Sequence, residues 1–278
     1  MRNLFAFAAL LVGLALPLSA FAEQRADWLM AAPGAPGNYA NVDVVFGAVQ
    51  GALEHRENIY GAANQLTLRG SAIAAVPFGG GQVDADLRLL VLTLGMSGGV
   101  TDSWRNQSFG ANEQMTRKER RMREAAGEFN SASYGFWEGR IGLDLPFNDY
   151  ALLHSVTSYR YSGAPARSFD NLIGVVHDGN YLRSDWQLFA KHRDWGAIGP
   201  MFQLLNYPLG NKLITQLNYG FALVTRAGLV RRDDFVFFQM LWNVGDALGG
   251  YDNRDNYGFA MLRGPIMFTL AYRSVISL

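Results

Sequence analysis

The sequence contains no cysteine, which excludes a disulfide framework, a thiolate metal site and a cysteine nucleophile. Neither sign of charge is in excess, because 24 Lys and Arg residues balance 24 Asp and Glu residues, and this balance points away from a nucleic-acid partner. Long apolar runs are confined to the N-terminus, which argues against helical membrane spans elsewhere. The four histidines are dispersed without metal-ligand spacing, so we expect neither a metal nor a cofactor.

The N-terminus has the three parts of an export signal. Met1-Arg2-Asn3 precedes an apolar run from Leu4 to Leu18, and Ser19-Ala20-Phe21-Ala22 ends in an Ala-x-Ala cleavage pattern. We therefore predict a cleaved signal peptide over 1–22 and a mature chain that starts near Glu23. Residues 23–40, rich in Ala, Pro and Gly, predict a flexible periplasmic segment, and residues 41–278 predict a single folded domain.

That domain is dominated by a two-residue alternation of apolar and polar side chains. Trp137-Glu138-Gly139-Arg140-Ile141-Gly142-Leu143-Asp144-Leu145 shows it most clearly, with charges on one face only. In an exported chain, repeated amphipathic strands predict an all-β fold, a transmembrane antiparallel up-and-down β-barrel. We predict about ten strands, with eight or twelve as alternatives, over these ranges: 41–54, 60–77, 83–103, 133–146, 150–162, 180–192, 197–208, 213–230, 235–248 and 257–278.

The connections between the predicted strands alternate in length. Short links are predicted at 78–82, 146–149, 192–196 and 231–234, and long ones at 104–132 and 163–179. Short periplasmic turns and long extracellular loops distinguish outer-membrane barrels from soluble sandwiches. Side-chain parity gives charge-free outer faces on most strands, but strands 41–54 and 150–162 do not divide cleanly. We place His154, Ser158 and Arg160 inward.

The chain resembles bacterial outer-membrane β-barrels as a class, including a final strand with Phe268, Leu270, Tyr272 and Ile276 that ends at Leu278. Members of this class usually end on Phe or Trp, which the assembly machinery recognises, and Leu278 departs from that pattern. The resemblance covers about residues 41–278. It implies a location in the outer membrane of a diderm bacterium, and as partners the membrane lipids and the barrel-assembly machinery.

The inward faces predict a charge network in the barrel interior. Its members are Arg69, Asp84, Asp86, Arg88, Glu138, Arg140, Asp144, Arg183, Asp185, Lys191, Arg226 and Arg263. A narrow barrel with these side chains inside should be mostly plugged. A narrow, anion-leaning channel for small solutes is the alternative, because the predicted interior is modestly positive.

The most charged segment, 113–128, lies in the second extracellular loop. Its bases are Arg117, Lys118, Arg120, Arg121 and Arg123. They interleave with four glutamates at spacings that include i,i+4 pairs, which predicts a short surface helix. Such a helix is either a self-neutralised, solvated element or a contact for lipopolysaccharide phosphates or an acidic envelope partner.

Catalytic motifs are weak, so we expect no enzyme. Ten-stranded barrels include the omptin proteases, whose Asp and His groups activate water at the extracellular rim, and this suggests His177-Asp178 with Asp252 and Asp255 as a rim-site hydrolase alternative. The primary prediction is a structural, lipid-contacting or partner-binding envelope component.

Overall fold

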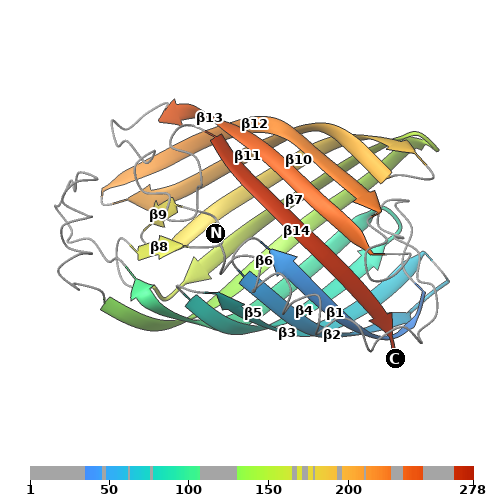
Figure 1. Cartoon of the computed structure of the whole chain (residues 1–278), viewed down its shortest axis with the longest axis horizontal. Coiled ribbons are helices and arrows are strands. Elements are labelled where there is room, and N and C mark those ends of the chain that lie inside the picture. The colour runs from blue at the N-terminus through green and yellow to red at the C-terminus, as the bar shows by residue number, and fades with distance from the viewer. Residues whose placement is uncertain are drawn as a thin grey trace, which may run out of the picture.

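The protein is a closed antiparallel β-barrel of twelve strands with a separate two-stranded hairpin, as seen in a computed structural model (Figure 1). The structure describes residues 35–45, 48–61, 63–75, 78–106, 130–164, 168–170, 175–177, 179–192, 196–209, 211–226, 234–246 and 266–278. The strands are β1 (Gly37–Val45), β2 (Ala48–Asn58), β3 (Asn64–Ala75), β4 (Phe78–Leu89), β5 (Leu92–Asn106), β6 (Asn130–Asn148), β7 (Ala151–Ser162), β8 (Ser168–Asp170), β9 (Val175–His177), β10 (Asn180–His192), β11 (Gly196–Leu209), β12 (Lys212–Arg226), β13 (Phe235–Asp246) and β14 (Ile266–Ser277).

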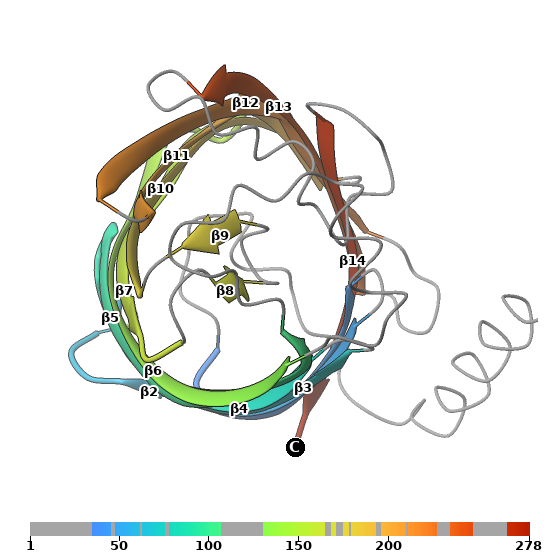
Figure 2. The same ribbon diagram turned by 90° about the vertical axis from the view of Figure 1, so that its left-hand side faces the viewer.

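Each barrel strand pairs with its neighbours along the chain, and the last strand closes onto the first. β7 pairs with β10, so the β8–β9 hairpin belongs to the connection between them. β1 and β14 meet over seven residue pairs, from Tyr39–Ser277 to Val45–Ala271. Figure 2 shows the ring of strands end-on. The predicted up-and-down barrel is therefore confirmed.

The predicted number of ten strands is wrong, because the first three predicted strands are five in the structure. Two residues, 46–47, separate β1 from β2, and two more, Leu90 and Val91, separate β4 from β5. The predicted link at 78–82 is also wrong, since these residues begin β4. From β6 onward each predicted barrel strand corresponds to an observed one, and 180–192 has the bounds of β10.

The split of the first predicted strand explains why its faces could not be assigned. In β1 the inward positions are odd-numbered and include Asn41 and Asp43, whereas in β2 they are even-numbered and include Ala52 and Glu54. A two-residue connection reverses the chain, and Asp43 then pairs with Gln50 across the hairpin. In β7, the other ambiguous strand, Ser158 and Arg160 are buried and inward.

All three long connections lie at one end of the barrel. They span 107–129, 163–179 and 247–265, after β5, β7 and β13. We call this the loop end, and the opposite end, where β1 begins and β14 finishes, the turn end. Connections at the turn end have at most eight residues. The predicted helix over 113–128 lies outside the described residues, as do 1–34, which include the predicted signal peptide.

The outer wall carries an apolar band. On β6 the outward side chains from Trp137 to Phe147 are all uncharged, and Ile141 and Phe147 are mostly exposed. Ten residues at about 3.3 Å each, on a strand tilted by about 40°, span about 25 Å along the barrel axis. This is the height of the apolar band of transmembrane barrels. In the described part of the chain, no helix is long and apolar enough to cross a bilayer.

Candidate functional site: the barrel interior

Arg140 is the centre of the charged part of the interior. Its guanidinium donates from Nε and Nη2 to the two carboxylate oxygens of Asp86, at 2.9 and 2.8 Å, and from Nη1 to Asp84 at 3.1 Å. Because Arg140 is on β6 and both aspartates are on β4, the side chain must cross β5. It crosses at Gly95, where an added Cβ would lie 2.1 Å from Asp86 Oδ1 and 2.5 Å from Arg140 Nε. The missing side chain at Gly95 therefore makes the three-strand bridge possible.

A second ion pair continues the network toward the loop end. Arg160 on β7 donates from Nε to Glu138 Oε2 at 2.9 Å, and its guanidinium lies 4.1 Å from the centre of the Phe136 ring. A charge stacked on a ring and paired with a carboxylate is held in one orientation. Only 9% of the Arg160 side chain is exposed. This part of the interior is therefore fixed rather than freely hydrated.

Toward the turn end, Asp144 is shared by two partners. Arg88 Nη1 lies 3.4 Å from Asp144 Oδ2, and His154 Nδ1 lies 2.6 Å from Asp144 Oδ1. The pairing of β6 with β7 places Asp144 directly opposite His154. The carboxylate thus orients the histidine ring.

The closing seam between β1 and β14 carries its own ion-pair cluster. Arg273 on β14 donates from Nη2 to Asp43 Oδ2 at 2.8 Å, and Arg69 Nη2 on β3 donates to the same oxygen at 3.3 Å. Beside them, Asn41 donates to Glu54 Oε2 at 3.0 Å. These contacts join the first three strands to the last one.

On β10 to β12 the polar interior becomes a chain of amides. Asp185 accepts from Arg183 Nε at 2.7 Å and from Gln203 Nε2 at 2.9 Å. Gln203 in turn accepts from Asn218 at 2.8 Å, and Asn218 accepts from Gln216 at 3.1 Å. All three amide side chains, of Gln203, Gln216 and Asn218, are buried. Such groups are tolerated in an interior because their hydrogen-bond donors and acceptors are matched.

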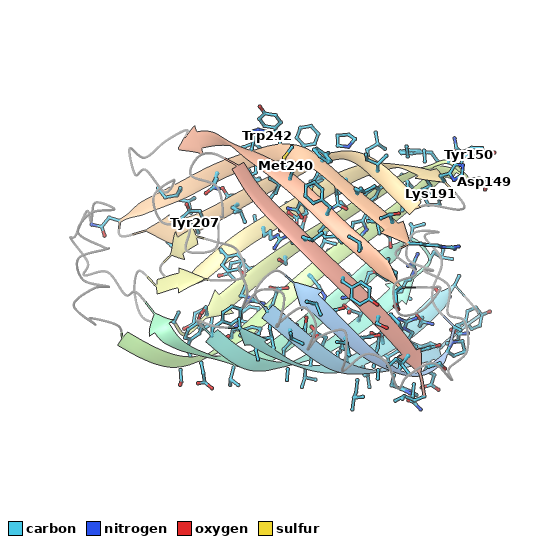
Figure 3. The ribbon with its side chains drawn as sticks, viewed as in Figure 1. Asp149, Tyr150, Lys191, Tyr207, Met240 and Trp242 are labelled. Carbon is cyan, nitrogen blue, oxygen red and sulfur yellow. The ribbon has the colours of Figure 1, made fainter. Side chains whose placement is uncertain are left out.

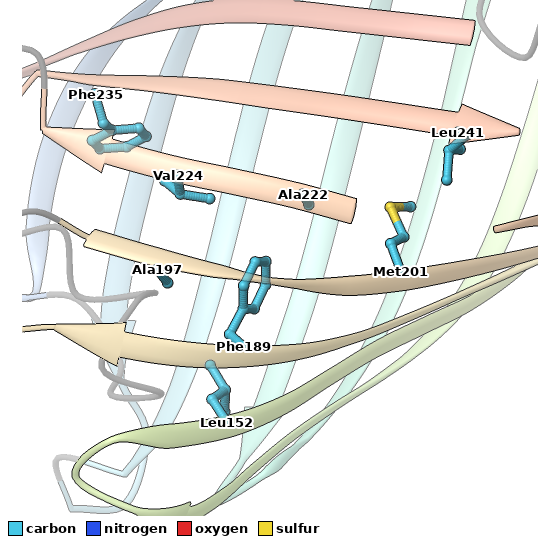
Figure 4. Packing of buried hydrophobic residues seen from close by; sticks show 8 residues of the cluster. All are labelled: Leu152, Phe189, Ala197, Met201, Ala222, Val224, Phe235 and Leu241. Carbon is cyan, nitrogen blue, oxygen red and sulfur yellow. The ribbon is translucent and has the colours of Figure 1, made fainter. Parts of the chain in front are cut away.

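The turn-end half of the interior contains a buried apolar cluster. A cluster of eight inward residues there has exposures between 0 and 6%. They come from β7, β10, β11, β12 and β13, and Figure 4 shows the eight side chains from close by. The members are Leu152, Phe189, Ala197, Met201, Ala222, Val224, Phe235 and Leu241, which we call the lumen cluster.

At the loop end, the β8–β9 hairpin lies within the ring of strands. The two strands pair from Ser168–His177 to Asp170–Val175, and β9 lies against β11. Both views place the hairpin inside the mouth of the barrel (Figures 1 and 2). The two strands β8 and β9 of the connection between β7 and β10 therefore occupy part of the mouth.

The structure brings most of the predicted lumen residues together. Nine of them are in the ion pairs described above: Arg69, Asp84, Asp86, Arg88, Glu138, Arg140, Asp144, Arg183 and Asp185. Lys191 and Arg226 lie at the turn end, where Lys191 pairs through its backbone with Tyr150 (Figure 3), and neither forms an ion pair with a described residue. Arg263 lies outside the described residues.

The sequence-based prediction missed the charges on the first two strands. Asp43, Glu54 and Arg56 face inward and are paired. Two additional carboxylates against one additional guanidinium bring the interior one charge closer to neutrality than the predicted positive lumen. The inward placement of these three charges depends on the hairpin between β1 and β2, which no turn motif in the sequence indicated.

Other predicted sites fall beyond the described part of the chain. This applies to the basic loop with Arg117, Lys118, Arg120, Arg121 and Arg123, and to Asp178, Asp252 and Asp255. His177, the remaining member of the rim-site alternative, ends β9 in the mouth.

A closed up-and-down antiparallel barrel with an apolar outer band and a polar interior defines the class, so the resemblance to bacterial outer-membrane β-barrels is confirmed. No family model and no curated protein matches the chain.

Similar solved structures include the NanC porin, with 13% identity over 87% of this chain and 99% of that chain and a TM-score of 0.36. They also include LpxR from Salmonella typhimurium, with 6% identity over 87% of this chain and 100% of that chain and a TM-score of 0.41. The KdgM porin has 9% identity over 87% of this chain and 98% of that chain, with a TM-score of 0.37.

Proposed function

We propose that this protein is an outer-membrane barrel whose interior is filled, and that it serves the cell envelope through its outer wall and its loop end. It is a structural, lipid-contacting or partner-binding component, without catalytic activity. The lumen cluster is the observation that carries this proposal. In an open, water-filled pore of twelve strands, inward side chains such as Phe189 and Met201 would be exposed to water. Here the two residues are only 2% and 1% exposed.

The charges of the interior support the same conclusion. Channels select ions through rings of unpaired charges of one sign. Here Arg140, Arg160 and Arg273 each lie against a carboxylate. Each of these ion pairs in the described part of the chain runs along the wall, between strands that are at most two apart. Pairing of this kind stiffens the wall and leaves little net field to attract a solute.

Planar-bilayer conductance tests the filled interior. The wild-type protein, folded as judged by heat-modifiable gel mobility, should show no steps above background. A Phe189→Ala, Met201→Ala variant removes bulk from the lumen cluster and should conduct. Leu188→Ala is the matched control, because Leu188 directly precedes Phe189 on β10 but points outward. This variant should show no conductance steps.

Steps in the wild type with an anion bias would overturn the proposal and establish the anion-leaning conduit instead. Recovery of the protein from the soluble periplasmic fraction would overturn the membrane location. Peptide or lipid hydrolysis that is lost in His177→Ala would establish the rim-site hydrolase.

A further inference from the structure

Three aromatic side chains form a patch on the outer wall near the loop end. Trp137 on β6 stacks on Tyr161 of β7, with ring centres 6.2 Å apart and planes 22° apart, and lies against Tyr159 with centres 5.8 Å apart. Their exposures of 52, 48 and 40% show that the rings also present free surface. We call these three residues the aromatic patch.

The aromatic patch marks the limit of the apolar band on the side of the loop end. On β5 the outward residues nearest to it are Gly98 and Val100, and the next outward residue is the charged Asp102, opposite Ser133. From Trp137 toward the turn end, β6 is uncharged on its outer face for the height of the band. The aromatic patch therefore lies where headgroups of the outer leaflet meet their acyl chains.

The wall around Trp137 is recessed. Its cross-strand neighbour on β5 is Gly98, and its outward neighbours on β6 are Gly135 and Gly139. A Cβ added at Gly139 would meet nothing within 4 Å, and one at Gly98 or Gly135 would meet only a backbone oxygen at 3.7 Å. The far side of the recess is bordered by Met96, which is 68% exposed. Bare backbone therefore lies open beside the ring.

The aromatic patch also offers hydrogen-bond donors. Tyr159 Oη accepts from Asn180 Nδ2 at 2.7 Å, which leaves its own proton to donate. Among the described residues, no acceptor is found for that proton, for Tyr161 Oη or for Trp137 Nε1. The outer Trp186 differs, because its Nε1 donates to Ser184 Oγ at 2.9 Å.

We infer that the aromatic patch and the glycine recess bind a glycolipid of the outer leaflet. Ring faces stack on sugar rings, the three donors meet phosphate or ester oxygens, and the recess takes the first acyl segment against the backbone. A phospholipid has the acyl chains and the phosphate but no sugar ring, so it fits less of this surface. The inference rests on the proposed function only for the membrane location.

Lipid retention in nanodiscs tests the site. The full-length protein is reconstituted with purified lipopolysaccharide or with phosphatidylglycerol, and the lipid that stays bound after detergent exchange is measured by native mass spectrometry. The wild type should retain lipopolysaccharide and lose phosphatidylglycerol. Gly139→Leu fills the recess, and Trp137→Leu removes the central ring. The Gly139 and Trp137 variants should each retain glycolipid at least about tenfold less well, a difference of about 1.4 kcal/mol.

Gly70→Leu is the matched control, because Gly70 is also outward with nothing within 4 Å of an added Cβ, but lies on β3 away from the aromatic patch. It should retain glycolipid like the wild type. Equal retention by Gly139→Leu and Gly70→Leu, or equal retention of both lipids by the wild type, would overturn the inference. Failure to insert into either bilayer would instead overturn the proposed function.

Discussion

Gly95 should be intolerant of even one added methyl group. In Gly95→Ala the new Cβ would lie 2.1 Å from Asp86 Oδ1 and 2.6 Å from Arg140 Cγ. Two non-bonded carbon atoms pack at about 3.5–4.0 Å, so the Arg140 side chain must leave its position between β6 and β4. Three charged hydrogen bonds, two to Asp86 and one to Asp84, would be lost together.

The size of the effect follows from the burial of the partners. Breaking a fully buried ion pair costs about 3–5 kcal/mol. Arg140 and Asp86 keep 18 and 29% of their side-chain exposure, whereas Asp84 keeps 6%, so water can replace part of the loss. We therefore expect the free energy of unfolding to fall by about 2–3 kcal/mol, near the range of hydrogen bonds to charged groups.

Urea titration of the barrel in lipid vesicles, followed by heat-modifiable gel mobility, measures this change. Gly70→Ala is the matched control, since its Cβ meets nothing within 4 Å, and it should change stability by no more than about 0.5 kcal/mol. In an Arg140→Ala background, Gly95→Ala should cost little more, because the interaction is already absent. Equal stability of Gly95→Ala and Gly70→Ala would refute the three-strand bridge.

Two further predictions concern the seam and the loop. Asp43→Asn should lower the free energy of unfolding by about 2–4 kcal/mol in the same titration, because it leaves Arg273 and Arg69 facing each other at the closing strands; a change no larger than in Gly70→Ala would contradict this. Replacing four loop arginines by Ser should leave assembly intact but reduce lipopolysaccharide co-purification at about 50 mM salt and not at about 500 mM, whereas equal retention at both would show a merely solvated loop. These arginines are Arg117, Arg120, Arg121 and Arg123.

Local alternation was sufficient to predict the architecture from β6 onward. Successive side chains of a strand point to opposite faces, so the inward charges Glu138, Arg140 and Asp144 follow from parity alone. In β7 alternation is ambiguous, and Arg160 is predicted to point inward because its charge would otherwise face lipid; the structure shows it as a buried partner of Glu138. An apolar, charge-free outer face is equally local, because it depends only on which residues alternate.

Turn chemistry misled the prediction in the first hundred residues. The turn between β4 and β5 contains Leu90 with a φ of 56°, a conformation for which Gly or Asn is the usual signal, so nothing marked the reversal. Conversely, Gly79 to Gly81 resembled a turn but lie in β4. An added Cβ at Gly80 would lie 2.5 Å from the Val100 carbonyl oxygen, so this glycine permits a close approach of two strands.

Only the tertiary structure decided which charges are partners and which apolar side chains meet in the interior. Arg140 and Asp86 are 54 residues apart, and Arg273 and Asp43 are 230 apart. Parity assigns a side chain to a face but carries no information on the neighbouring strand or the register between strands. Those depend on the number of strands and on closure of the ring. The sequence alone therefore determined a membrane barrel with a charged interior. The twelve-strand closure determined the seam, the Arg140 bridge and the lumen cluster.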